Sequence, residues 1–125
     1  IGLQWNTQVT LEGASHLVSQ AYCSAMPVAY TVHEHELWRP LATLILEAAY
    51  EATICAAMIN RQKTGNPKAY LTLLGGGAFG NPRDWILKAL RRSLERYTDS
   101  GLEISIVSHG WSNPSLQQLA SEFTK

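Results

Sequence analysis

The sequence predicts an α/β fold in which helices flank a parallel or mixed sheet. Helical and strand patterns alternate from residue 36 to residue 123, and this alternation is typical of parallel sheets. The two strand patterns in this part each run into a loop and then into a helix start. With 125 residues, of which 46% are hydrophobic, the chain is long enough to form one domain or part of one.

The longest predicted element is a helix over residues 36–63. Its apolar side chains recur every three or four positions and leave a narrow polar stripe that includes Glu47 and Tyr50. A helix this apolar is expected to be covered on most sides. Gly65-Asn66-Pro67 predicts its end, because glycine suits the left-handed C-cap and proline cannot continue a helix. The apolar positions are Leu37, Leu41, Leu44, Ile45, Ala48, Ala49, Ala52, Cys55, Ala56 and Ile59.

Two strand-and-helix units follow the long helix. Residues 69–74 are a short, nearly continuous apolar run, which predicts a buried strand at the centre of a parallel sheet. An amphipathic helix is predicted over residues 85–97, and an alternating strand over residues 102–108. A last helix is predicted over residues 115–123, after Ser112 or Asn113 as the cap.

The first 35 residues have a less regular pattern. Residues 4–11 and 16–22 each predict a strand, and Glu12-Gly13-Ala14-Ser15 predicts the turn between them. Pro27 argues against a central strand in the segment that follows.

The most distinctive segment is Gly75-Gly76-Gly77-Ala78-Phe79-Gly80, directly after the strand predicted over residues 69–74. Consecutive glycines let the backbone approach a ligand closely, and successive N–H groups in such a loop attract anions. Asn81 is predicted to cap the next helix, with Pro82 in its first turn and Asp84 at the positive end of its dipole. We therefore predict a phosphate or diphosphate site here. The simpler alternative is a tight turn that needs glycine only for its geometry.

The glycine segment differs from two common nucleotide-binding motifs. No Lys-Ser or Lys-Thr pair follows it, so nothing is placed to bind a γ-phosphate and Mg²⁺ as in a Walker loop. It also lacks the first-strand position and the acidic ribose ligand of the dinucleotide fingerprint. Diphosphate binding by backbone amides, with neither a metal nor a cofactor, is what the sequence predicts.

The segment LTLLGGGAFGNPRDWILKAL resembles the second diphosphate-binding loop of macro domains. It is most similar to the glycine-rich segment of the poly(ADP-ribose) glycohydrolase branch of that superfamily. The order of elements over residues 37–123 also resembles the second half of a macro domain. The resemblance implies a single macro-like domain over residues 1–125, or the C-terminal part of one.

The resemblance also implies roles for individual residues. The backbone of Gly76 to Ala78 and of Gly80 would bind the diphosphate of ADP-ribose, and Phe79 would pack against the distal ribose. Asn81 would cap the helix and reach a ribose hydroxyl, and the loop that begins at His109 would lie near the adenosine. Phe79 and Trp111 also have the simpler interpretation of core aromatics. The implied ligand-binding residues are Gly75, Gly76, Gly77, Ala78, Phe79, Gly80, Asn81 and His109.

Several parts of the family pattern are missing from this sequence. We find no first strand with an adenine-selecting Asp, no first glycine-rich loop and no match to the paired catalytic glutamates. Residues 20–25 lie where the family has its ribose-binding segment, but the residue types differ. The low charge and the absence of an initiator Met lead us to expect the C-terminal part of a longer protein.

The predicted function is binding of ADP-ribose or a related nucleotide diphosphate, with or without hydrolysis of an ADP-ribosyl linkage. The alternative is a non-catalytic protein-interaction module in which the glycine loop only allows a strand and a helix to pack closely. The catalytic residues of an enzyme are not identifiable from these 125 residues.

Other groups of polar residues favour structural interpretations. Glu47 and Glu51 share a helix face and could act as acid and base, but a partly solvated stripe is the simpler interpretation. The run from His33 to Glu36 lacks a third metal ligand at a usual spacing. Cys23 and Ser24 have no partner base within a known catalytic pattern. Arg91, Arg92 and Arg96 predict a solvated helix face with ion pairs one turn apart.

Composition limits the partners and the location. Ten basic and ten acidic residues give no net charge, which argues against nucleic-acid binding by charge. Charged residues make up only 16% of the chain, so we expect its surface to meet another segment of the same protein or a second copy. No uninterrupted apolar run reaches 18 residues and no signal peptide is recognisable, which predicts no membrane contact and a cytoplasmic location. The two cysteines are predicted to be buried, reduced thiols.

Overall fold

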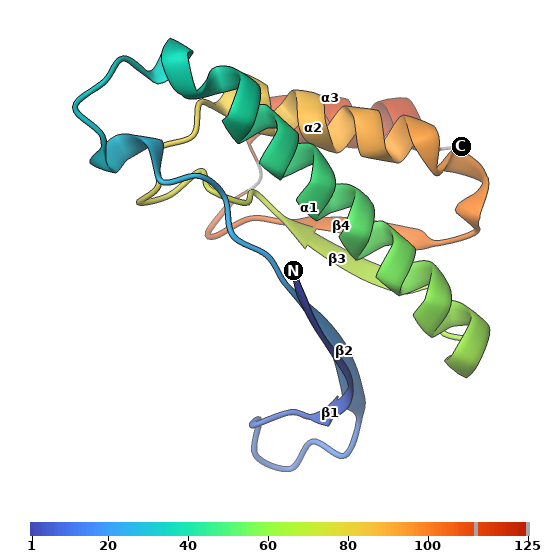
Figure 1. Ribbon diagram of the computed structural model, residues 1–125. Coiled ribbons are helices and arrows are strands. Elements are labelled where there is room, and N and C mark those ends of the chain that lie inside the picture. Colours follow the sequence, from blue (N-terminus) through green and yellow to red (C-terminus); the bar gives the residue numbers. More distant parts are fainter. Residues whose placement is uncertain (112, 125) are drawn as a thin grey trace.

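A computed structural model describes residues 1–111 and 113–124 and shows an α/β arrangement of three helices and two small sheets (Figure 1). The predicted alternation of helices and strands after residue 35 is confirmed. The strands are β1 (Gly2–Gln8), β2 (Leu17–Tyr22), β3 (Lys68–Thr72) and β4 (Glu103–Val107). The helices are α1 (His35–Thr64), α2 (Arg83–Arg96) and α3 (Pro114–Phe123), with short 3-10 turns η1 (Val28–Tyr30) and η2 (Thr98–Ser100).

The main sheet consists of β3 and β4, which are parallel and in register from Lys68 opposite Glu103 to Thr72 opposite Val107. All three helices cover the same face of this sheet (Figure 1). Burial alternates along β3, so that Leu71 is buried while Tyr70 is 64% exposed. The prediction of a central strand was therefore wrong. Among the described residues β3 pairs with β4 alone, and helices cover only one of its faces.

Helix α1 forms as the apolar periodicity predicts and ends where Gly65 adopts a left-handed conformation (φ 77°). The Gly65 N–H donates to the Arg61 carbonyl, which satisfies one of the last free acceptors of the helix. One face of α1 packs on α2 and β3 and contributes Ala42, Leu46 and Ile54 to the core.

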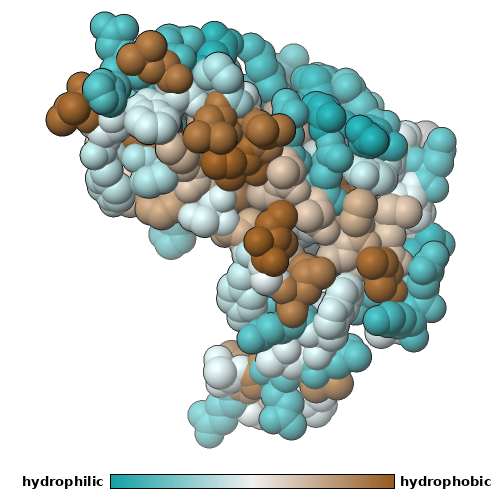
Figure 2. Space-filling view, viewed as in Figure 1, coloured by the Kyte–Doolittle hydropathy of each residue, from teal (hydrophilic) through white to brown (hydrophobic). Residues whose placement is uncertain are grey.

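The opposite face of α1 corrects the prediction that this helix is covered on most sides. Leu37, Leu41 and Leu44 remain 72%, 46% and 61% exposed. Figure 2 shows hydrophobic surface gathered over this half of the helix. By length and composition alone, α1 is also long and apolar enough to cross a membrane. A helix that packs in the core of a folded domain can meet the same criterion. The other described helices do not meet that criterion.

The hydrophobic core lies between α1, α2 and the covered face of the sheet. Its largest fully buried side chains include Trp85, Ile86 and Leu90 from α2, and Leu46 and Ile54 from α1. These α2 residues recur at the spacing of one helix face, which is why the sequence predicted an amphipathic helix there.

Arg91 and Arg92 form ion pairs with neighbouring helices in place of the predicted pairs within α2. Arg92 of α2 contacts both Glu47, at 3.5 Å, and Glu51 of α1, and Arg91 forms an ion pair with Glu122 of α3. The hydrogen bond from Arg91 lowers the pKa of Glu122 below its usual value. The predicted solvated arginine face is thus a set of cross-helix contacts, because α1 and α3 flank α2. Glu47 and Glu51 are partly exposed, as predicted, and their partner is Arg92.

The N-terminal hairpin of β1 and β2 extends away from the helical layer (Figure 1). Its strands are antiparallel, with an irregularity between Gln4 and Thr7. None of residues 1–24 is buried. The hairpin is joined to α1 by a hydrogen bond from Ser19 Oγ to Asn60 Oδ1 (2.8 Å) and by Lys63, whose Nζ lies 4.9 Å from the Trp5 ring centroid.

Both cysteines are free thiols and are half-buried, so the predicted absence of a disulfide agrees with the structure while full burial does not. Cys23 Sγ lies 3.9 Å from the Ala49 carbonyl oxygen and 3.7 Å from Thr53 Oγ1. Cys55 Sγ lies 3.4 Å from the Tyr97 hydroxyl. Each thiol thus packs where another element meets α1.

Tyr50 joins α1 to the end of β3. Its side chain is only 3% exposed, although the sequence placed it on the polar stripe. The hydroxyl donates to the Thr72 carbonyl (2.8 Å) and accepts from the Leu74 N–H (3.0 Å). Burial raises the pKa of this hydroxyl to about 12. Tyr50 therefore fixes the backbone immediately before the glycine loop.

Replacing Tyr50 with Phe should destabilise the fold by about 1 kcal/mol, because the Thr72 carbonyl and the Leu74 N–H each lose a bond to the hydroxyl and keep only the bond to each other (2.9 Å). The measurement is urea denaturation. The matched control is Tyr70→Phe, at an exposed tyrosine of β3, which should change stability by less than about 0.5 kcal/mol. Equal losses in the two variants would contradict this role of the Tyr50 hydroxyl.

Alkaline pH should weaken the fold through the same hydroxyl. An unfolded tyrosine has a pKa of 10.0, and the pKa of folded Tyr50 is about 12. The stabilisation by the neutral hydroxyl is therefore complete below pH 10 and is lost as the pH rises through 12. The loss should be about 3 kcal/mol, because each tenfold change in an equilibrium constant is worth about 1.4 kcal/mol. Stability measured against pH should fall less steeply over this window in Tyr50→Phe than in Tyr70→Phe.

Candidate functional site

The glycine loop connects the end of β3 to the start of α2 and packs tightly against the segment that follows β2. Gly75 and Gly80 have positive φ angles of 76° and 66°. A Cβ atom on Gly75 would lie 2.4 Å from the Ala25 Cβ, and one on Gly80 would lie 2.7 Å from the Ala29 Cβ. Glycine is therefore required at both positions by conformation and by space.

Three internal hydrogen bonds shape the loop. The N–H groups of Gly76, Gly80 and Asn81 donate to the carbonyls of Leu73 (3.2 Å), Gly77 (3.0 Å) and Gly75 (3.0 Å). In contrast, the N–H groups of Gly77, Ala78 and Phe79 have no partner among the described residues. Gly77 and Ala78 are exposed. The loop thus uses some amides to fix its own shape and leaves three successive donors available to a ligand.

Asn81 anchors the loop and does not cap α2 as predicted. It is 4% exposed, and its Nδ2 donates to the carbonyls of Met26 (2.8 Å) and Gly75 (3.3 Å). Pro82 occupies the N-cap position without a side-chain hydrogen bond, so helical residues begin at Arg83. The prediction failed because the Asn81 side chain is directed to a segment distant in sequence. Its Oδ1 is buried and has no partner among the described residues.

The start of α2 adds further unpaired donors beside the loop. The first amides bonded within the helix, those of Trp85 and Ile86, both donate to the Pro82 carbonyl. The amides of Arg83 and Asp84 precede them and have no partner among the described residues. Asp84 lies in the first turn, as predicted, where a carboxylate favours the positive end of the helix dipole.

Phe79 packs against η1 and is half-buried. Its ring contacts Tyr30 edge to face, with centroids 6.1 Å apart, and its carbonyl accepts from the Ala29 N–H (3.0 Å). Tyr30 itself is 70% exposed. The two rings form an aromatic surface beside the loop. Tyr30 could not be predicted from the sequence, because no local pattern links it to a glycine segment nearly fifty residues later.

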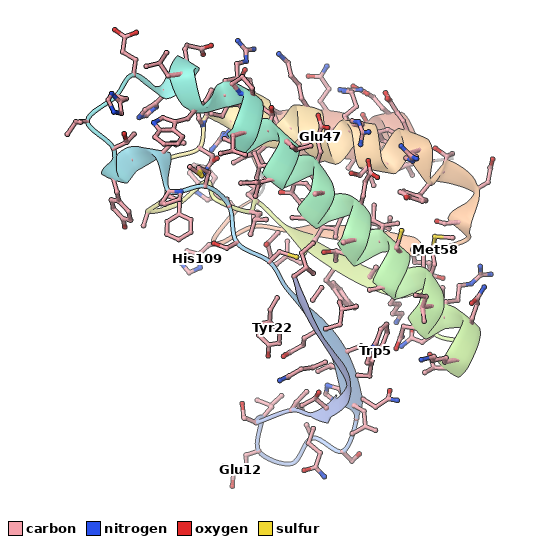
Figure 3. All side chains as sticks on the ribbon, in the orientation of Figure 1. Trp5, Glu12, Tyr22, Glu47, Met58 and His109 are labelled. Carbon is pink, nitrogen blue, oxygen red and sulfur yellow. The ribbon has the colours of Figure 1, made fainter. Side chains whose placement is uncertain are left out.

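The loop after β4 and the glycine loop both follow the carboxyl ends of their strands. They lie at the same end of the sheet, because β3 and β4 are parallel (Figure 1). His109 is exposed there (Figure 3). Trp111 is 90% exposed, so its interpretation as a core aromatic was wrong. No hydrogen bond joins His109 to the glycine loop among the described residues. Asn113 caps α3 by accepting from the Ser115 N–H (3.0 Å), while the alternative cap, Ser112, lies outside the described residues.

The remaining polar groups are not brought together as a reactive centre. Within residues 1–111 and 113–124, no three His, Cys, Asp or Glu side chains gather as metal ligands. The ring of His33 lies beside Trp38, with centroids 6.5 Å apart. Cys23 contacts Thr53 instead of a histidine. The glycine loop with its neighbouring aromatic side chains is therefore the candidate site.

Comparison with protein-family models, curated proteins and solved structures found no match to this chain. Function is therefore inferred from the geometry of the loop and from the resemblance of its sequence. The geometry separates glycines that the fold needs, Gly75 and Gly80, from Gly77, which has no neighbouring atom within 4 Å of an added Cβ.

Gly75→Ala should destabilise the fold by about 2 kcal/mol or more, because alanine disfavours positive φ and its methyl group would overlap Ala25. Gly77→Ala should leave stability within about 0.5 kcal/mol of the original chain, since this position is open. Thermal or urea denaturation of both variants measures the difference. If both lost the same stability, the described loop conformation would be incorrect.

Proposed function

We propose that this chain binds ADP-ribose or a related nucleotide diphosphate at the glycine loop. The observation that carries the proposal is the run of N–H groups from Gly77 to Phe79, which have no partner within the described part of the chain. These donors stand next to the N-terminus of α2, whose dipole attracts negative charge. A diphosphate matches this arrangement because its oxygens are anionic and accept several hydrogen bonds at once.

The loop is organised before any ligand arrives, which favours binding. Hydrogen bonds within the loop, the contact of Gly80 with Ala29 and the Asn81 anchor all limit its motion. A preorganised loop loses less conformational entropy when a ligand binds. The amides can therefore contribute most of their hydrogen-bond energy to affinity.

The surroundings of the loop suit the other parts of a nucleotide diphosphate. Asn81 Oδ1 has no partner among the described residues, but it is buried, so it would accept from a ribose hydroxyl only where the loop opens to admit one. The half-buried ring of Phe79 would pack against a ribose. His109 and Trp111, exposed on the neighbouring loop, would lie toward the adenosine end.

Binding without hydrolysis is the activity that the described groups support. Asp84 is the only carboxylate in residues 73–84, and it lies 3.9 Å from Lys88 Nζ in the first turns of α2. Glu47 and Glu51 pair with Arg92. These contacts leave no unpaired carboxylate beside the proposed diphosphate in this part of the chain. Membership of the macro-domain superfamily, which the loop sequence suggests, is part of the same proposal.

The alternative, an interaction module with a purely structural loop, explains Gly75 and Gly80 but not Gly77. At Gly77 neither positive φ nor close packing calls for glycine. A ligand that lies across the exposed backbone would explain the absence of a side chain there.

The cytoplasmic location and the contact with a second segment or copy stay predictions of the sequence.

Saturating ADP-ribose should raise the melting temperature of the chain, since a ligand at 100 times its Kd adds about 2.7 kcal/mol of stability. Gly77→Val should abolish this gain, because its branched side chain would cover the free amides while meeting no protein atom. The matched control is Gly2→Val, at an exposed glycine of β1 where an added Cβ would meet only the Tyr22 Cβ, at 3.8 Å.

Thermal shift and titration calorimetry with ADP-ribose, ADP and AMP measure the effect. The first two ligands should bind more tightly than AMP, because they carry a diphosphate. Equal binding of ADP-ribose by Gly77→Val and the original chain, or no binding at millimolar ligand, would refute the proposal.

A further inference from the structure

A groove of about 1010 Å³ separates the hairpin from the main sheet. We call it the β2–β3 groove. One wall is the hairpin, with residues of both β1 and β2, and the other is the first half of β3. The floor is the C-terminal half of α1. It is distinct from the glycine loop, none of whose residues line it. Figure 1 shows the hairpin diverging from β3 and β4 on this side of α1.

The wall formed by β3 is an unpaired strand edge. Glu103 N–H donates to the Pro67 carbonyl (2.9 Å), and a parallel ladder uses alternate residues of each strand. Residues 67, 69 and 71 therefore direct their backbone groups to β4, while Lys68 and Tyr70 direct theirs to the groove. The Lys68 N–H is bonded to Asn66 Oδ1 (3.1 Å). The Tyr70 N–H and carbonyl have no partner among the described residues.

One edge of β2 is also unpaired, because among the described residues β2 pairs with β1 alone. In the hairpin, Trp5 lies on the side toward the last turns of α1, and Tyr22 lies on the other side (Figure 3). A two-stranded hairpin is only marginally stable in water unless further strands or a helix support it. A strand between β2 and β3 would join the two sheets into one.

The floor and the charge of the groove indicate the chemistry of such a strand. Thr53, Ala56 and Ala57 of α1 line the floor with short side chains, which leaves room for the inward side chains of an added strand. No Asp or Glu is among the described residues that line the groove, whereas Lys68 and His16 are. The lining is therefore complementary to an acidic or neutral segment and not to a basic one.

We propose that the β2–β3 groove binds an extended, acidic peptide segment of a partner protein by strand addition. Backbone hydrogen bonds to Tyr70 would give affinity, and small apolar side chains on alternate residues would pack on the alanine floor. This inference is independent of the proposed diphosphate site and stands or fails separately.

The test uses the full chain and a fluorescein-labelled peptide, Glu-Val-Thr-Val-Thr-Val-Glu, with both ends blocked. Fluorescence anisotropy should show saturable binding, and amide hydrogen exchange at Tyr70 should slow by about tenfold or more. A peptide with Lys in place of both Glu should bind more weakly, as should one with Pro in place of the central Val, which lacks an N–H. Equal affinity for all three peptides, or no binding of the first, would overturn the proposal.

Two variants localise the binding. Ala57→Phe places a ring on the groove floor and should weaken peptide binding by about tenfold or more, whereas Ala48→Phe, at an exposed alanine of the same helix, should leave it unchanged. Tyr70→Pro removes the free N–H without removing a bond to β4, and should also weaken binding. Equal affinity of Ala57→Phe and Ala48→Phe for the peptide would overturn the proposal.

Sedimentation of the chain without peptide tests a second copy as the occupant. The chain should be monomeric in this measurement, and Ala57→Phe should sediment as the original does. A dimer that Ala57→Phe disrupts would assign the groove to a second copy and overturn the proposal of a separate partner.

Discussion

The contact between the segment after β2 and the glycine loop is the constraint on which the candidate site depends. Ala25 and Ala29 lie so close to Gly75 and Gly80 that no side chain fits between them, and Asn81 bonds across the same boundary to Met26. These contacts join parts of the chain about fifty residues apart. They set which loop amides are consumed internally and which remain free.

The packing of the helices fixes the positions of the elements that make this contact. Trp85, Ile86 and Leu90 bury one face of α2 against α1, so the start of α2 has a defined position relative to β3. Tyr50 reaches from α1 to the backbone at the end of β3 and aligns the point where the loop begins. The cross-helix ion pairs of Arg92 are exposed and contribute less than the apolar packing does.

Two regions of the molecule therefore differ in physical character. The glycine loop is a compact, internally bonded structure with a few free donors, which suits a small anionic ligand. The β2–β3 groove encloses about 1010 Å³ and lies between the unpaired edge of β3 and a hairpin without buried residues, which suits a polypeptide segment. Because different elements build them, occupancy of one site does not require occupancy of the other.

The sequence by itself determined the secondary structure after residue 35 and the place of the glycine loop, because periodicity, helix stops and glycine runs are local signals. Only the tertiary structure decided that Asn81 anchors the loop, that Tyr50 is buried, that Leu41 and Trp111 are exposed and that β3 has an open edge. These properties depend on which distant segment packs against each residue. A pattern of nearby residues carries no information about such partners.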